Sequence, residues 1–256
     1  CIISPFIVGG AMAPVTVAGT LSQVLAEVLA GVAYSQLVRK GAPVIFGTFV
    51  TSIDMNSGAP TFGTPESSKV LYAAGQLARR LKIPYRSGGG LCGSKITDAQ
   101  AAYETSNSLQ AGLMGGVNFM LHSCGWLEGG LVASVEKFIM DADQLGILNS
   151  LSKGIDVEER DLAFEAIKDV GAGGHFLGCD HTQKNFKSAF WRSDILNYKP
   201  FETWQEEGEK DLTYEAYKKA KQLLKNYEAP ELELSKIEEL KEYVLKKKSS
   251  MPDAFV

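Results

Sequence analysis

Short apolar stretches alternate with longer amphipathic stretches over the first two thirds of the chain. The short stretches have the length and the β-branched or aromatic content of strands, and glycine or polar turn residues follow each of them. Strands are expected at Ile2–Val8, Val44–Val50, Pro84–Ser87, Asn118–His122 and Gly174–Leu177. Strands that alternate with helices predict an α/β fold with a parallel sheet.

Capping patterns mark the starts of the intervening helices. Each start has a side chain that can accept a hydrogen bond from the first helical turn, and three of the four are followed by Gln or Glu at capping-box spacing. The four predicted starts are Thr20, Thr64, Thr97 and Asp156. In the helix after Thr20, the side chains Leu21, Leu25, Val28 and Val32 are expected to form one apolar face.

The pattern changes after Leu177. An aromatic-rich stretch runs from Phe186 to Trp204, and a charged tail from Asp211 to Lys248 is typical of a solvated helix. Five strand–helix units are too few for an eight-stranded barrel. The pattern by itself therefore fits either an open doubly wound sheet or the C-terminal part of a longer barrel. Both architectures place ligands at the carboxyl ends of the parallel strands.

Composition excludes some classes of function. The 256 residues include 26 basic and 30 acidic side chains, a net charge of −4, which lacks the basic footprint of a nucleic-acid-binding protein. No uninterrupted apolar run reaches the ~18 residues that span a bilayer, so no membrane segment is expected. The four cysteines are widely spaced, as in reduced cytoplasmic proteins.

The residues that follow the expected strands are candidates for a site. Gly88, Gly89 and Gly90 form an unusual triplet, which fits neither a P-loop nor a dinucleotide fingerprint and suggests close approach of a ligand to the backbone. His122 and His181 follow two strands, whereas His175 is expected to lie in the core.

The aromatic rings near these strand ends, among them Phe49, Tyr85 and Trp126, fit either core packing or a cage for a cation. A zinc site is a further alternative, and its ligands would be His122, Cys124, Cys179 and His181.

Several motifs resemble those of the trimethylamine methyltransferase family, and the likeness extends to about Gly208. The motifs are Gly10-Ala11-Met12-Ala13-Pro14-Val15-Thr16, Gly41-Ala42-Pro43-Val44-Ile45, Ser94-Lys95, Asp98-Ala99-Gln100-Ala101, Gly115-Gly116-Val117-Asn118, Gly125-Trp126-Leu127-Glu128-Gly129-Gly130-Leu131 and Gly174-His175-Phe176-Leu177-Gly178. Founding members carry pyrrolysine around the region of the Gly-rich turn and Asp98. Every residue here is standard, so the chain is similar to the non-pyrrolysine branch, whose members demethylate quaternary amines such as glycine betaine.

The resemblance implies a fold and a domain organisation. Members of the family are TIM barrels that are longer on the N-terminal side, so residues 1–208 are expected to form the C-terminal part of a barrel, about five strand–helix units, and residues 209–256 a helical tail. It also implies a cytoplasmic, homo-oligomeric enzyme.

The activity implied is transfer of a methyl group from a methylated amine to the cobalt of a corrinoid on a partner protein, with no metal on this chain. We expect His122 to be the catalytic residue, which orients the substrate or hydrogen-bonds its carboxylate, and Phe49, Tyr85, Arg86, Trp126 and His181 to bind the substrate. Gly88, Gly89 and Gly90 would leave the barrel mouth open to the corrinoid ring. A structural ion pair for Arg86, a zinc-dependent methyltransferase acting on a thiol or alcohol, and a non-catalytic betaine-binding protein are alternatives.

Overall fold

The computed structural model describes residues 1–251, and its chain divides into two units. The first unit is Cys1–Ala220 and the second is Lys221–Val256. The last five residues of the predicted tail, 252–256, lie outside the described part.

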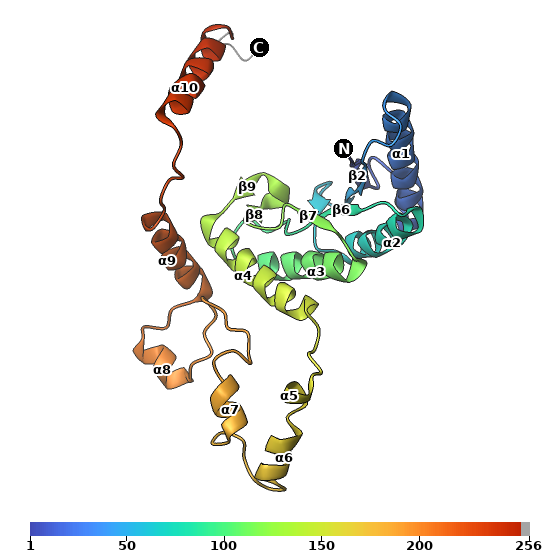
Figure 1. Cartoon of the computed structure of the whole chain (residues 1–256). Coiled ribbons are helices and arrows are strands. Elements are labelled where there is room, and N and C mark those ends of the chain that lie inside the picture. Colours follow the sequence, from blue (N-terminus) through green and yellow to red (C-terminus); the bar gives the residue numbers. More distant parts are fainter. Residues whose placement is uncertain (252–256) are drawn as a thin grey trace. The chain divides into compact units, whose positions relative to one another are not determined.

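The first half of the first unit is a parallel α/β structure, as the sequence predicts (Figure 1). Its elements are β1 (Ile2–Ile3), β2 (Phe6–Gly9), α1 (Val17–Val38), β3 (Ile45–Gly47), β4 (Phe49–Ile53), β5 (Pro60–Thr61), α2 (Pro65–Leu81), β6 (Tyr85–Gly88), α3 (Ala99–Gly115) and β7 (Phe119–Leu121). One sheet has the order β1-β3-β6-β7, and all its neighbouring strands are parallel. A second sheet has the order β2-β4-β5, in which β4 is parallel to β2 and antiparallel to β5. Four of the five expected strand regions are thus confirmed.

The remaining elements are a small hairpin followed by helices. They are β8 (Trp126–Leu127), the 3₁₀ turn η1 (Glu128–Gly130), β9 (Val132–Ala133), α4 (Val135–Ser152), α5 (Glu159–Leu162), α6 (Phe164–Val170), α7 (Asp180–Asn185), α8 (Phe201–Glu206), α9 (Leu212–Lys225) and α10 (Leu234–Ser249). The charged tail is therefore two helices rather than one, because it is interrupted between residues 225 and 234. Helix α4 has a serine cap, Ser134, whose side chain accepts from the amide of Lys137; its start was not among those predicted.

The expected strand Gly174–Leu177 does not exist in the structure. This segment is irregular and exposed, and His175 within it is exposed as well, so the prediction of a core histidine is wrong. A short apolar stretch becomes a strand only when a neighbouring strand satisfies its backbone groups. Residues 174–177 have no such partner in the described part of the chain.

Three of the four helix starts needed correction by a few residues. The start predicted at Asp156 is wrong, because the next helix, α5, has Glu158 at its N-cap position, without a side-chain capping bond. Thr64 occupies the N-cap position of α2 and Pro65 is its first residue, as expected, although the Thr64 side chain makes no capping hydrogen bond. Helix α1 begins earlier than predicted, because Thr16 accepts from the amide of Gly19, while the hydroxyl of Thr20 donates to the carbonyl of Pro14. Helix α3 is capped by Asp98 rather than by Thr97.

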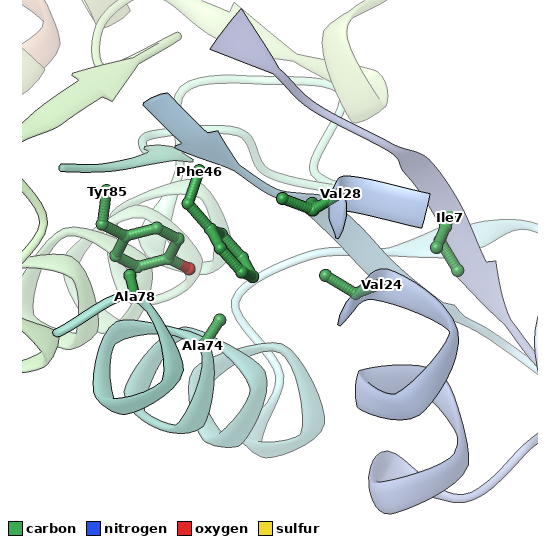
Figure 2. Packing of buried hydrophobic residues seen from close by; sticks show 7 residues of the cluster. All are labelled: Ile7, Val24, Val28, Phe46, Ala74, Ala78 and Tyr85. Carbon is green, nitrogen blue, oxygen red and sulfur yellow. The ribbon is translucent and has the colours of Figure 1, made fainter. Parts of the chain in front are cut away.

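A hydrophobic core joins α1 and α2 to the strands (Figure 2). Val24 and Val28 of α1, with Ala74 and Ala78 of α2, pack on strand side chains, and the largest of these are Tyr85 and Phe46. The expected apolar face of α1 is confirmed, because Leu21, Leu25 and Val32 also pack against this core. Its burial stabilises the sheet on the face that the helices cover.

Helix α1 is also long and apolar enough to cross a membrane by the criteria of length and composition. The expectation of no uninterrupted apolar run of that length still holds, since Gln23 and Glu27 interrupt this helix, which meets the criteria by its mean hydropathy. Core helices and signal sequences meet the same criteria. The core contacts of Val24 and Val28 give α1 one reason to be apolar in this structure.

Candidate functional site

The sheet has a second face, opposite the core, that carries aromatic side chains and one arginine. Side chains alternate between faces along a strand, so Val50 of β4 and Tyr85 of β6, which pack in the core, leave their neighbours Phe49 and Arg86 on the opposite face. Phe6 lies beside Phe49 in register, and Phe119 lies beside Arg86. Phe6 is 54% exposed although its ring is wholly apolar. This face is the candidate functional site.

Four rings form a continuous row on this face. The rings of Phe6 and Phe49 stack with centroids 5.1 Å apart, and Phe49 meets the edge of His122 at 5.4 Å. His122 in turn meets Trp126 edge to face at 6.1 Å. Three separate chain segments thus contribute to the row, and the structure brings together the predicted residues Phe49, His122 and Trp126. Aromatic faces of this kind attract organic cations.

His122 follows β7 in a backbone conformation that side-chain-bearing residues rarely adopt. Its φ is 55°, which costs about 1–3 kcal/mol and persists where the surroundings enforce it. Its carbonyl accepts a hydrogen bond of 2.7 Å from the amide of Gly90. Its Nδ1 is buried and has no hydrogen-bond partner among residues 1–251. Burial, and to a smaller extent the charge of Arg86, lowers the pKa of His122 below 6.5, so the ring is neutral at pH 7.

Arg86 is a buried guanidinium without an acidic partner. It is only 5% exposed, and one terminal nitrogen donates to the hydroxyl of Ser4 at 2.8 Å and to the carbonyl of Thr48 at 3.0 Å. Its Nε is buried without a partner, and within the described chain no carboxylate lies within 4.0 Å of the side chain. Burial lowers the pKa of Arg86 below its usual value. An unpaired buried charge is costly, and an anionic ligand would relieve that cost.

Tyr85 does not join this face. Its side chain lies in the core beside Phe46 and Ala78 (Figure 2), and its hydroxyl shares a 2.8 Å hydrogen bond with Thr48. Burial raises the pKa of Tyr85 to about 12. The expectation that Tyr85 contacts substrate does not fit this placement, because the strand turns Tyr85 and its neighbour Arg86 to opposite faces.

The glycine triplet is closed by the chain itself. Gly89 and Gly90 are buried, and a methyl group on Gly90 would lie 2.4 Å from the carbonyl oxygen of Ser123. A methyl group on Gly89 would lie 2.8 Å from the hydroxyl of Ser123. The close approach that the triplet accommodates is therefore that of the loop after β7, which packs against Gly89 and Gly90.

A comparison within the triplet tests this role. Gly90→Ala should lower the free energy of unfolding by about 1–3 kcal/mol, because the loop backbone must move to admit the methyl group. Gly88→Ala is the control, since a methyl group there would meet only the ring of Phe49, at an ordinary 3.5 Å. Urea unfolding of both variants would show the difference, and equal stabilities would contradict the packing role.

His181 and Cys179 do not follow a strand, because His181 lies within α7 and Cys179 is the N-cap residue of this helix. Cys179 precedes α7, and its thiol contacts the hydroxyl of Thr182 at 3.4 Å. Burial, with the charge of Asp141, raises the pKa of Cys124 to about 11. Among the described residues no group of three or more His, Cys, Asp or Glu side chains could hold a metal ion. The four residues of the zinc alternative are not gathered into a ligand set.

The sequence analysis did not predict a role for Phe6 or for the ion pair formed by Lys137 and Asp141. Phe6 could have been found from its alternation with the core residue Ile7, since it precedes Ile7 within one strand. Lys137 and Asp141 have the spacing of an ordinary surface pair on a helix, and no signal in the sequence marks them as buried.

Comparison with known proteins identifies the family of this chain. A sequence model described as trimethylamine methyltransferase matches residues 1–252. The chain belongs to the trimethylamine methyltransferase family. A glycine betaine methyltransferase of Desulfitobacterium hafniense is similar to this family member, with 41% identity over 232 residues, which cover 91% of this chain and 48% of the relative.

Two further relatives are named trimethylamine methyltransferases. One, from Desulfitobacterium hafniense, is 34% identical over 85% of this chain and 44% of its own length. The other, from Methanosarcina barkeri, is 31% identical over 92% of this chain and 47% of its own length. The chain spans about half the length of the curated relatives it matches.

Proposed function

We propose that the protein transfers a methyl group from a quaternary methylated amine of the glycine betaine type to the Co(I) of a corrinoid carried by a partner protein. The observation that carries this proposal is the buried, unpaired Arg86 beside a row of aromatic rings. A betaine has a carboxylate and a quaternary ammonium, and this face has a separate group for each.

The two ends of a betaine would be held by different forces. The ammonium would lie against the rings of Phe49 and Trp126, an attraction of about 0.5–2 kcal/mol for each desolvated contact. The carboxylate would accept from Arg86 in a charge-assisted hydrogen bond. His122 between the two rings would orient the substrate, and because it is neutral at pH 7 it adds no repulsion to the cation.

The proposed methyl transfer needs no proton donor among these residues. When the carbon–nitrogen bond breaks, its electrons stay on nitrogen, and a quaternary ammonium leaves as a neutral tertiary amine that needs no acid. The corrinoid, when docked, supplies the Co(I) electron pair that forms the new cobalt–carbon bond. This chain must orient one methyl group outward and exclude water, and such positioning contributes up to about 7–11 kcal/mol.

We further propose that these strands belong to a TIM barrel. Helices α1 and α2 cover one face of parallel strands, and in a TIM barrel the other face would be the interior, with residues 1–208 as the later part and 209–256 as a helical tail. Phe49 follows the carboxyl end of β3 and His122 follows that of β7, and barrel enzymes have their active sites at this end of the strands. We propose a cytoplasmic homo-oligomer for the whole protein. The corrinoid would approach this open face, not the buried Gly89 and Gly90.

Arg86 favours a carboxylate-bearing amine over trimethylamine. Trimethylamine has no anionic group with which to pair a buried guanidinium, whereas glycine betaine has one. The relative named for glycine betaine is also more similar to this chain, at 41% identity, than the two named for trimethylamine, at 34% and 31%.

The test is methyl-cobalt formation by the protein at its natural length, mixed with reduced corrinoid and one amine at a time. Glycine betaine should give methyl-cobalt absorbance, as should a relative with the same two groups, such as proline betaine or carnitine. Choline has the same ammonium without the carboxylate, and dimethylglycine has the carboxylate without the quaternary nitrogen. Both should react at least tenfold more slowly. No methyl-cobalt with any amine, together with measurable betaine binding, would instead establish a binding protein.

A further inference from the structure

A buried ion pair lies behind the candidate site without facing it. Lys137 and Asp141 are one turn apart on α4, and Lys137 is only 1% exposed. Its Nζ donates to the two carboxylate oxygens at 2.7 and 2.6 Å, and its third hydrogen goes to the hydroxyl of Thr105 on α3 at 2.7 Å. Every donor of the ammonium is therefore satisfied, which is the condition under which a buried pair is tolerated.

The acidic end of the pair holds the loop that carries the site residues. The carboxylate of Asp141 accepts from the amide of Gly125 at 2.9 Å, and the carbonyl of Gly125 accepts from the amide of Ser134 at 2.9 Å. Gly125 has a φ of +84° and immediately precedes Trp126. Both backbone polar groups of Gly125 are thus bonded to the start and the inner side of α4.

The ammonium group of Lys137 is linked to His122 by a second series of hydrogen bonds. The hydroxyl of Thr105, which accepts from Lys137, donates to the carbonyl of Gly90 at 3.1 Å. The amide of Gly90 donates in turn to the carbonyl of His122 at 2.7 Å. The ion pair therefore connects to the backbone on both sides of Ser123 and Cys124, and it fixes the segment from His122 to Trp126 at its two ends.

We propose that Lys137 and Asp141 are positioning residues for methyl transfer, which hold the His122–Trp126 segment so that both rings face the substrate. Neither residue touches the proposed substrate, and the proposal rests on the proposed function. Its physical reason is that reacting groups misplaced by about 1 Å can cost about 100-fold in rate. The strained φ of His122 shows that this segment needs external support.

Two double variants separate the role of the Gly125 hydrogen bond from that of the charges. Lys137→Met/Asp141→Asn and Lys137→Met/Asp141→Leu both remove the buried charges, and asparagine and leucine are of similar size. Only asparagine keeps an acceptor for the amide of Gly125. In the natural-length protein, the asparagine variant should stay within about threefold of the parent in kcat/KM, and the leucine variant should lose at least tenfold, mostly in kcat.

A second measurement follows the site itself. The imidazole titration of His122, read by NMR and assigned with His122→Gln, should keep its midpoint in the asparagine variant and shift toward 6.5 in the leucine variant, because a released ring is less buried. This readout needs no substrate. If no amine is a methyl donor, the proposed function fails while the titration still tests the positioning. Unchanged kinetics and an unchanged His122 midpoint in both variants would overturn the proposal.

A milder pair covers the case in which the leucine variant does not fold. Thr105→Ser keeps the hydroxyl that bridges Lys137 and Gly90, whereas Thr105→Val keeps the shape and removes it. The valine variant should lose at least fivefold in kcat/KM and shift the His122 midpoint, and the serine variant should do neither. Equal behaviour of the two variants would contradict the network.

Discussion

The Arg86→Gln variant should turn over glycine betaine with a kcat/KM about 100-fold lower than the parent, a loss of about 2.7 kcal/mol. The guanidinium is buried and has no carboxylate within 4.0 Å in the described chain, so the substrate carboxylate would be its ionic partner. Removing one partner of a buried charged hydrogen bond typically costs about 2–5 kcal/mol. Initial rates of methyl-cobalt formation measure the effect.

Choline and a lysine variant serve as the controls. Any slow turnover of choline should be unaffected by Arg86→Gln, because choline has no carboxylate that could bond to Arg86. Arg86→Lys should recover part of the rate by keeping the charge without the planar fork. The melting temperature should not fall in Arg86→Gln, since an uncompensated buried charge is removed. A large fall in stability with an unchanged kcat/KM would show that Arg86 is structural.

Acidification should reduce kcat/KM for glycine betaine as His122 gains a proton. Its folded pKa lies below 6.5 because the ring is buried and near Arg86, so the neutral form predominates at pH 7. Below its pKa, the ring would carry positive charge next to the bound ammonium. The rate should therefore be level above about pH 6.5 and fall about tenfold for each further pH unit once below the folded pKa.

The same group affects stability with a defined sign. The unfolded state binds a proton on His122 near pH 6.5, and the folded state binds it only at lower pH. The contribution of His122 is therefore lost as pH falls from about 6.5 through the folded pKa, and it is fully present above that window. His122→Gln should remove this acidic limb from both kcat/KM and the melting temperature. A limb that persists in His122→Gln would assign the titration to another group.

Local sequence signals were sufficient where the deciding interactions are local. Thr64 followed by Pro65 marks the start of α2, because the fixed φ of proline suits the first helical position and acts locally. The same kind of signal misplaced the start of α1. Thr20 and Gln23 fit a capping box, yet the hydroxyl of Thr20 bonds to Pro14 and the true cap is Thr16. A capping pattern is short and recurs by chance, and only the path of the preceding chain selects among matches.

The two histidines expected after strands show a second limit. His122 and His181 look alike in the sequence, since each follows a short apolar stretch. The first stretch pairs with β6 and becomes β7, which brings His122 between Phe49 and Trp126. The second has no partner strand in the described part of the chain, and His181 lies in α7. Strand formation depends on a neighbour that is distant in sequence.

The sequence by itself determined the parallel α/β pattern, the apolar face of α1, the membership in a family, and the prediction of a site that includes Phe49, His122 and Trp126. The fold pattern and the apolar face follow from periodicity, the family from motifs spread along the chain, and the predicted site from residues near strand ends. Only the tertiary structure decided that Tyr85 faces the core while Arg86 is buried without an acid, and that Lys137 and Asp141 are buried behind the site. Burial and pairing depend on which distant segments meet, and that information is absent from any local stretch of the chain.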